Sequence, residues 1–347
     1  MKNVFIRTAA LMLATTFAAP AFAGDIKFGG KIYADMTQKS VTSAGVKTTT
    51  RGANLTRSYF SAKTDLDDTW SVAFKVDVSA ETGLKKNNQI FLKQAQLTGH
   101  FMPEFNAKLG VIGTAWVGHE EHLFGHRYIS KSFVDTQGLD SSADAGLGVF
   151  GKVADGMFNY EVAVINGKGY GDTASTGAQD INARFGINVS GLTVDLGLRS
   201  GYMGTKTTTA TTTGTKYVLT QLMVSYGMGH DFRVGANIVS DKATPATGAA
   251  GKLTGLDIFA QAKFTDQLGA FATYQTAKLD AAGAILGAAK KFGKMTGAAT
   301  EKRTVVSVDY KVQKKVLVSL ALTNVKDLNG VAGKKETIAG LYSQFKF

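Results

Sequence analysis

The chain has 347 residues, of which 39 are lysine or arginine and 27 are aspartate or glutamate, so its formal net charge is +12. It contains no cysteine, which excludes disulfide bonds and any cysteine-based metal or redox centre. The mean hydropathy is −0.01, and beyond the first residues no run of about 18 apolar residues could cross a bilayer as a helix. Two architectures fit these facts: a soluble exported protein, and a membrane β-barrel whose strands alternate apolar and polar residues.

The N-terminal residues have the layout of a cleavable signal peptide. Lys2 and Arg7 precede an apolar run, and Ala21-Phe22-Ala23 provides the small residues that signal peptidase recognises. We therefore expect residues 1–23 to be removed and residues 24–347 to form a single mature domain. Losing the two cations lowers the net charge from +12 to 37 − 27 = +10. Export excludes nucleic acid as a normal partner and leaves anionic lipopolysaccharide and small anions.

Apolar and polar residues alternate along segments of about ten residues throughout the mature chain. This period predicts strands, because successive side chains of a strand point to opposite faces. One segment departs from the pattern, since Lys93 shares a face with Phe91, Ala95 and Leu97, which indicates a bulge or a position at a rim. We predict sixteen strands, at residues 25–37, 54–65, 70–80, 89–101, 106–116, 144–153, 157–166, 180–190, 192–203, 216–227, 231–241, 254–265, 268–279, 302–311, 315–324 and 336–347.

The predicted connections alternate between short and long. Short turns such as 65–69 and 154–156 separate long polar stretches, such as 38–53, 166–179, the threonine-rich 205–215, 242–253, 280–301 and 325–335. A transmembrane barrel has this arrangement, with short turns on the periplasmic side and long loops outside the cell. A soluble β-sandwich would also alternate, but it would not normally sustain sixteen strands with strictly alternating connections. The sequence therefore predicts an all-β, antiparallel transmembrane barrel.

The last residues form a strand that ends in an aromatic residue. Leu341, Phe345 and Phe347 share one face, while Tyr342, Gln344 and Lys346 share the other. Together with the signal peptide, the sixteen segments and the alternating connections, this ending resembles the closing strand of bacterial outer-membrane porins. The resemblance implies a sixteen-stranded, homotrimeric diffusion porin of the Gram-negative outer membrane. It also implies that the third long loop, here residues 117–143, folds into the lumen and narrows it.

This constriction loop carries seven polar residues of interest: His119, Glu120, Glu121, His122, His126, Arg127 and Lys131. The histidines and acids could be zinc ligands, so His119, His122 and His126 are a weak candidate for a metal site. The spacing is not that of the helical HExxH motif. The alternative is a polar loop that is held to the barrel wall by hydrogen bonds and ion pairs, with no metal.

Basic residues outnumber acidic ones on the predicted lumen face. Those expected to line the pore are Lys27, Lys31, Arg57, Lys75, Arg184, Arg199, Arg233 and Arg303. Rings of arginine and lysine favour anions in a pore, although many of these residues could instead pair across strands. We therefore expect a passive pore for small hydrophilic solutes and ions with a mild anion preference. A phosphate- or anion-selective porin is the alternative, as is a structural barrel that serves as an adhesin or sheathes an electron-transfer partner.

Catalysis has no support in the sequence, since we find no nucleophile with a histidine and an acid in a familiar context. Residues 166–171 are glycine-rich after a predicted strand, but no helix or GK[ST] motif follows them. We therefore expect no enzyme activity and no cofactor.

Overall fold

The computed structural model describes residues 25–79, 89–171, 179–203, 215–229, 231–245, 248–280 and 293–347. The predicted signal peptide lies outside these ranges, as do most of the predicted loops at 205–215 and 280–301. No helix in the described ranges is long and apolar enough to cross a membrane.

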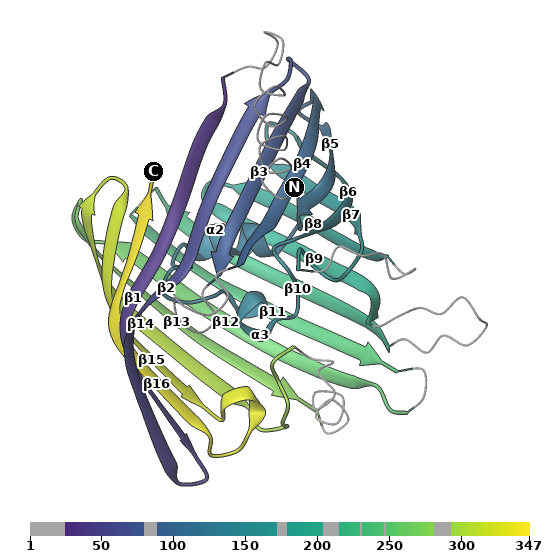
Figure 1. The fold of residues 1–347 in the computed structure, drawn as a ribbon. Helices are drawn as coiled ribbons and strands as arrows, with labels where there is room; N and C mark the ends of the chain where they lie inside the picture. Colours follow the sequence, from purple (N-terminus) through teal and green to yellow (C-terminus); the bar gives the residue numbers. More distant parts are fainter. Residues whose placement is uncertain are drawn as a thin grey trace, which may run out of the picture.

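In the part of the chain that the structure describes, sixteen antiparallel strands form one closed barrel, each paired with its neighbours in chain order (Figure 1). The strands are β1 (Lys27–Ser43), β2 (Val46–Asp65), β3 (Trp70–Ser79), β4 (Gln89–Met102), β5 (Phe105–Gly113), β6 (Ala143–Val153), β7 (Phe158–Ile165), β8 (Asp180–Val189), β9 (Leu192–Met203), β10 (Thr215–Met228), β11 (Phe232–Thr244), β12 (Gly251–Lys263), β13 (Leu268–Leu279), β14 (Glu301–Gln313), β15 (Val316–Lys326) and β16 (Lys335–Lys346). The predicted fold class is confirmed.

The first and last strands close the barrel. Phe345 of β16 lies opposite Ile32 of β1, and the backbones of Phe347 and Gly30 exchange two hydrogen bonds of 3.2 Å. The last strand is thus the closing strand that the resemblance implies. Closure leaves no unpaired strand edge, which a bilayer would penalise strongly because it offers no water to the free backbone groups.

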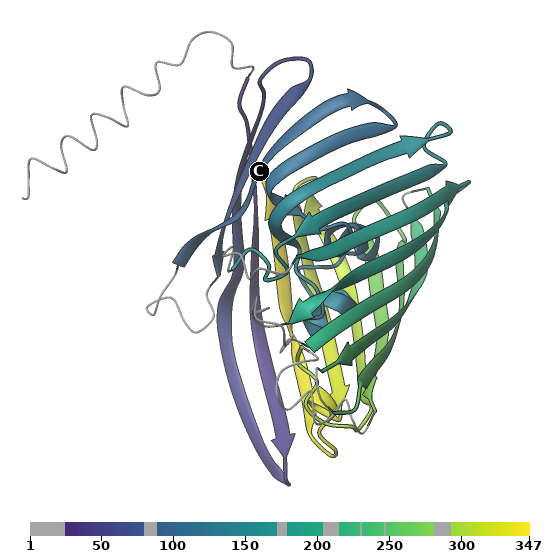
Figure 2. The same ribbon diagram turned by 90° about the vertical axis from the view of Figure 1, so that its right-hand side faces the viewer.

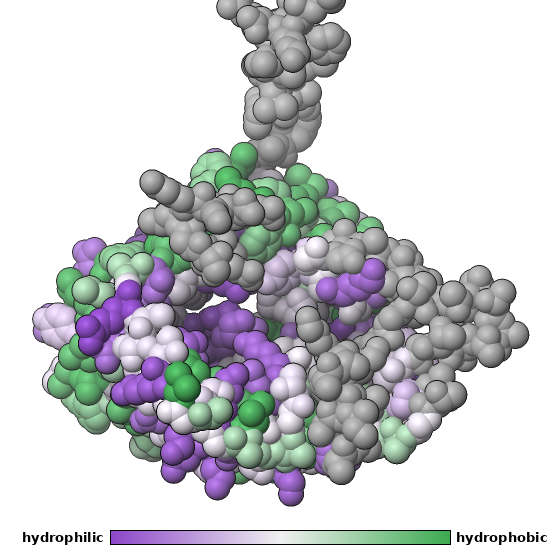
Figure 3. Space-filling model, turned by 60° about the horizontal axis from the view of Figure 1, so that its bottom comes forward, coloured by the Kyte–Doolittle hydropathy of each residue, from purple (hydrophilic) through white to green (hydrophobic). Residues whose placement is uncertain are grey.

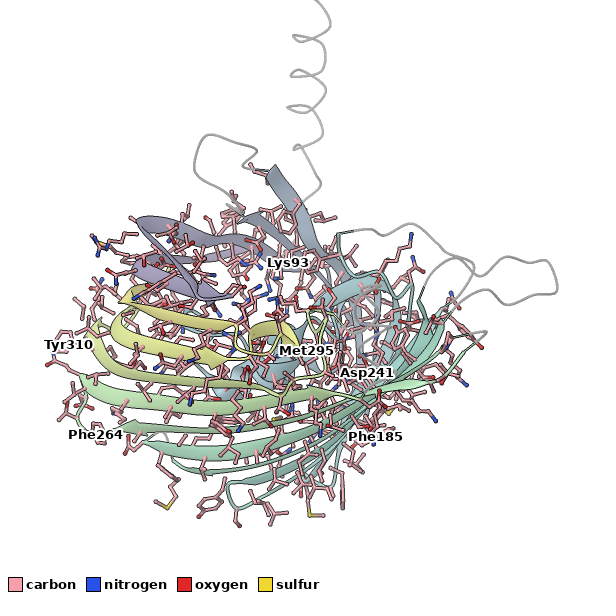
Figure 4. All side chains as sticks on the ribbon, turned by 90° about the horizontal axis from the view of Figure 1, so that it is seen from below. Lys93, Phe185, Asp241, Phe264, Met295 and Tyr310 are labelled. Atoms are coloured by element: carbon pink, nitrogen blue, oxygen red, sulfur yellow. The ribbon has the colours of Figure 1, made fainter. Side chains whose placement is uncertain are left out.

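Side chains on the two faces of the wall have opposite character. On β9, Asp195 points inward and is fully buried, while the next residue, Leu196, is 57% exposed. In Figure 4, Phe185 and Tyr310 project from the outer surface, whereas Lys93 lies inside the ring of strands. Figure 3 shows that the end of the barrel turned toward the viewer is hollowed and that hydrophilic residues line the hollow. An apolar exterior around a polar interior is the arrangement of a membrane barrel.

The first hairpin differs from the prediction. Residues 38–53 do not form a long loop, because β1 and β2 continue to a tight turn in which Ala44 and Gly45 have φ of 49° and 80°. In Figure 2 the hairpin, coloured purple, reaches beyond the neighbouring strands at this end. The prediction failed here because these residues are polar and the strand they form buries no apolar face. Its threonines nevertheless favour an extended backbone.

The irregularity predicted at Lys93 is a β-bulge. The pairing of β3 with β4 shifts between Lys75, which lies opposite Gln94, and Val76, which lies opposite Leu92. Lys93 is the extra residue, and it turns into the lumen. The inside and outside positions of β4 therefore exchange at this point.

The connection between β5 and β6 folds into the barrel. It carries α2 (Val117–Phe124) and α3 (Phe133–Gln137), and both helices lie inside the ring of strands (Figure 1). We call residues 114–142 the inserted segment. A short 3₁₀ turn, η1 (Leu328–Gly330), lies in the connection between β15 and β16.

We predict that a charge on the outer wall destabilises the barrel. Leu320 lies in the middle of β15 and is 66% exposed, so Leu320→Arg should lower the free energy of unfolding in lipid vesicles by about 2–4 kcal/mol. Val331 is 39% exposed but lies in the connection after β15, so Val331→Arg is the control and should change stability little. Urea titration measures both. Equal effects of the two variants would contradict a lipid-facing wall.

Candidate functional site

One side of the inserted segment is apolar and packs against the inner wall. The ring of Phe124 contacts those of Phe259 and Phe271, with centroids 5.5 and 4.9 Å apart. Trp116 and Phe133 are also buried in this cluster. Hydrophobic burial therefore contributes to docking of the segment, in addition to the expected hydrogen bonds and ion pairs.

Two glycines of the wall make room for these rings. A Cβ at Gly197 would lie 2.3 Å from the ring of Trp116, and one at Gly255 would lie 2.0 Å from the ring of Phe133. Contacts this short do not occur between real atoms, so any larger residue would force a ring to move. The glycines therefore set how closely the inserted segment approaches the wall.

Arg184 on β8 anchors the start of the inserted segment. Its guanidinium donates to Asp195 Oδ1 at 2.9 Å and to the carbonyl oxygen of Ala115 at 3.1 Å. His119 of α2 lies 2.7 Å from the other oxygen of Asp195. Burying the charges of Arg184 and Asp195 is tolerable only because each one is paired and hydrogen-bonded.

Arg199 on β9 anchors the other end of the segment. It forms ion pairs with Asp140 of the inserted segment and with Asp180 of β8, the latter at 2.8 Å, and Tyr217 donates a hydrogen bond to Asp180. Burial raises the pKa of Asp140 above its ordinary value, although Arg199 acts in the opposite direction. Arg184 and Arg199 were predicted to line the pore, but both are buried and serve to hold the segment.

Further polar contacts hold the middle of the segment. Glu120 is 1% exposed and accepts hydrogen bonds of 2.7 Å from Ser132 and from Asn237 of β11. Tyr128 lies 2.6 Å from the hydroxyl of Ser319 on β15. The contacts together tie the segment to strands from β8 to β15.

The three histidines of the segment do not converge. His119 contacts Asp195 of β9, while His126 Nε2 lies 2.8 Å from Asp309 of β14. His122 keeps part of its side chain in solvent, and the partial desolvation of the rest together with the nearby Arg233 lowers its pKa. Among the described residues, no group of three or more histidines and acids could hold a metal ion. The geometry thus favours hydrogen-bonded anchoring over the weak metal candidate.

An open space remains between the inserted segment and the wall formed by β1–β5. This cavity has a volume of about 520 Å³. The wall contributes Lys31, Lys75 and Lys93, and the segment contributes Glu121 and Arg127. This cavity is therefore lined by several charged side chains.

Each of the first four strands contributes a cation to the inner side of this wall: Lys31 on β1, Arg57 on β2, Lys75 on β3 and Lys93 on β4. Arg57 is paired with Asp77 at 2.7 Å, and Lys93 lies 4.0 Å from the same carboxylate. Lys93 Nζ also lies 4.9 Å from the centre of the Tyr59 ring, within range of a cation–π interaction. Among the described residues, Lys31 and Lys75 form no ion pair.

The segment side of the cavity is close to neutral. Arg127 donates to Glu121 at 2.5 Å and to Asp135 at 2.9 Å, and Lys131 lies 3.0 Å from Asp135. Burial alone would lower the pKa of Arg127, but Asp135 and Glu121 raise it above its ordinary value. Burial would likewise raise the pKa of Asp135, but Arg127 and Lys131 bring it below its ordinary value. The uncompensated positive charge therefore lies on the β1–β4 wall.

The remaining predicted pore residues lie away from this cavity. Lys27 is exposed and lies 3.6 Å from Asp65, Arg233 is half-buried on β11, and Arg303 lies 3.5 Å from Glu301. Sequence reasoning did not assign Lys93 and Lys346 to the pore, although both line the cavity. The broken alternation at Lys93 was the available signal for the first, and the alternating terminal strand was the signal for the second.

Solved structures with this architecture are known. The fold is that of the porins. An anion-selective porin from Comamonas acidovorans matches with a TM-score of 0.68 at 12% identity, covering 94% of this chain and 100% of that one. The trimer form of OmpT, an outer-membrane protein of Vibrio cholerae, gives 0.63 at 12% identity over 93% and 99% of the chains. Salmonella typhi OmpF in complex with daunomycin gives 0.63 at 12% identity over 93% and 98%. The sequence matches no protein-family model and no curated protein.

We predict that enlarging Gly255 loosens the inserted segment. Gly255→Ala should lower the free energy of unfolding by about 1–3 kcal/mol, because the new methyl group overlaps the ring of Phe133. Adding Phe133→Leu should restore part of this loss. A Cβ at Gly52 would meet nothing within 4 Å, so Gly52→Ala serves as the control in the same denaturant titration. A loss that Phe133→Leu leaves unchanged would contradict the proposed overlap.

We also predict that Glu120 makes docking of the segment depend on pH. Burial raises the pKa of Glu120 to about 8, although Ser132 and Asn237 oppose the shift. The raised pKa means that the folded protein binds the proton more tightly than the unfolded chain. Stability from Glu120 is therefore complete below the unfolded pKa and is lost as pH rises through about 8, at up to about 1.4 kcal/mol per pH unit.

Unfolding titrations between pH 5 and 9 of the natural protein and of Glu120→Gln measure this effect, since glutamine keeps the shape but cannot ionise. We expect Glu120→Gln to become more stable relative to the natural protein as pH rises. A difference that stays constant would contradict the raised pKa.

Proposed function

We propose that the protein is a passive porin of the Gram-negative outer membrane, exported behind a signal peptide at residues 1–23 and assembled as a homotrimer. The cavity beside the inserted segment carries this proposal, because it is an open space lined by charged side chains inside a barrel whose exterior is apolar. The fold shared with outer-membrane proteins supports the location, and the trimer form of the Vibrio cholerae protein supports the assembly. Small hydrophilic solutes would diffuse down their gradients, which requires no cofactor.

A mild preference for anions follows from the charges beside the passage. Lys31 and Lys75 form no ion pair among the described residues, whereas Arg127 on the opposite side is balanced by Glu121 and Asp135. The excess positive charge lowers the electrostatic barrier for anions and raises it for cations. The low dielectric constant of the wall concentrates this field in the lumen.

Selectivity for phosphate is a second candidate, because three ammonium groups converge on one cavity. Lys31, Lys75 and Lys93 all line it, and charge-assisted hydrogen bonds to phosphate oxygens are stronger than neutral ones. A phosphate-selective pore would bind phosphate long enough to obstruct chloride. Chloride current that falls on adding inorganic phosphate would support this candidate, and current that is unchanged would exclude it.

The anion preference is tested by the reversal potential in a KCl gradient across a planar bilayer. We expect the sign of an anion-selective channel for the natural protein. Lys75→Gln with Lys93→Gln should lower the ratio of anion to cation permeability at least about five-fold, since a single lost charge already contributes roughly 1 kcal/mol near water. Lys314→Gln with Lys315→Gln removes two exposed charges from a turn and should change the ratio little.

A cation-selective sign for the natural protein would overturn the anion preference. A purified trimer that never conducts would overturn the pore itself and would favour the structural alternative, an adhesin or a sheath around an electron-transfer partner.

A further inference from the structure

The glycine-rich turn that follows β7 is held in one backbone conformation. Gly167 and Gly169 have φ of 85° and 74°, values that favour glycine. Their amides donate hydrogen bonds of 2.9 Å to the same oxygen of Asp144 on β6, and Arg199 donates to the carbonyl oxygen of Gly167 at 2.8 Å. The fixed turn therefore determines where the next residue, Tyr170, lies.

Tyr170 reaches from the end of β7 to the inner side of β4. Its ring stacks on that of Phe91, with centroids 5.6 Å apart and an angle of 3° between the ring planes. Phe91 lies opposite the buried Asp77 in the strand register, so it faces the lumen. Two strands, β5 and β6, separate β4 from β7 in the barrel. The turn thus carries an aromatic ring across the inner face of the wall.

The ammonium group of Lys93 lies between two tyrosine rings. Its Nζ is 5.0 Å from the centre of the Tyr170 ring and 4.9 Å from that of Tyr59, both within range of a cation–π interaction. Asp77 lies 4.0 Å from Nζ and is already paired with Arg57 at 2.7 Å. The rings therefore hold the ammonium group beside the cavity without a close ion pair.

A lysine ammonium group ends a flexible four-carbon chain, so its position depends on what surrounds it. Without Tyr170, the ammonium group of Lys93 would be free to close on Asp77 or to turn away from the cavity. We propose that Tyr170 is a positioning residue that fixes the Lys93 ammonium group beside the cavity and thereby sets part of the anion preference. This inference rests on the proposed pore, and it adds a residue outside the inserted segment to those that determine selectivity.

Reversal potentials in a KCl gradient across a planar bilayer test the role of Tyr170. Tyr170→Leu removes the aromatic face and should lower the ratio of anion to cation permeability about two-fold, because a lysine that closes on a carboxylate loses part of its field in the cavity. Tyr170→Phe keeps the face and should keep the ratio. In a Lys93→Gln background, Tyr170→Leu should cause no further decrease.

A matched control removes a tyrosine from the outer face. Tyr226 on β10 is 42% exposed, and Tyr226→Leu should leave the ratio unchanged. An equal decrease in the two tyrosine variants would overturn the inference. So would a decrease from Tyr170→Leu that is the same with and without Lys93, because a merely structural role predicts that result.

The turn offers a second way to displace the ring. A Cβ at Gly169 would lie 2.7 Å from Oγ of Ser141, so Gly169→Ala should shift the turn. We expect this variant to lower the permeability ratio of the natural protein but not that of Tyr170→Leu. A decrease in both would contradict an action through Tyr170.

Unfolding titrations in lipid vesicles test the contact without conduction. The natural protein, Tyr170→Leu, Lys93→Gln and the double variant form a double-mutant cycle, which also shows whether each variant folds. We expect the two residues to be coupled by about two- to five-fold in the unfolding equilibrium constant, as for other cation–π pairs. An anion-selective pore without this coupling would overturn the inference and leave the pore. A protein that shows the coupling and never conducts would overturn the proposed pore instead.

Discussion

The interior of this protein depends on how the inserted segment docks against one side of the barrel. Aromatic side chains around Phe124 pack on β12 and β13, and Arg184 and Arg199 bind its two ends from β8 and β9. Because the segment fills that side, the cavity of about 520 Å³ lies against the wall of β1–β5. A barrel without this docking would have a wide lumen of uniform character.

Docking also decides which basic residues face the open cavity. Arg184 and Arg199 are enclosed by carboxylates and backbone oxygens, so their charges are neutralised within the protein. Lys31 and Lys75 face the segment across the cavity and keep their charge available. The charge inside the lumen therefore depends on which cations are paired with carboxylates, and the net charge of the chain does not determine it.

The barrel itself could be predicted from the sequence, because strand period, connection length and the final phenylalanine all follow from local chemistry. The bulge at Lys93 was equally visible, since a bulge breaks the period where it occurs. The long first hairpin was missed because its polar ends lack an apolar face. The apolar side of the inserted segment was missed for a different reason. Phe124 and Phe133 are isolated among polar residues, and the residues they pack against lie more than a hundred positions further along the chain. The pairing of Arg184 and Arg199 could not be predicted either, because it depends on contacts with the inserted segment that are distant in the sequence.

The bulge on β4 shows how a barrel strand can hold one extra residue without losing its apolar outer face. In a regular strand, successive side chains alternate between the outer face and the lumen face. Inserting one residue would therefore move every later side chain to the opposite face. At Lys93 the extra residue absorbs that shift locally, so Leu92 still faces outward while Lys93 and Gln94 both face the lumen. A single added residue thus gives the cavity one more cation and leaves the apolar outer surface intact. Deleting Lys93 should restore a regular strand and leave the barrel folded. The charge of the cavity can therefore change without a loss of stability in the wall.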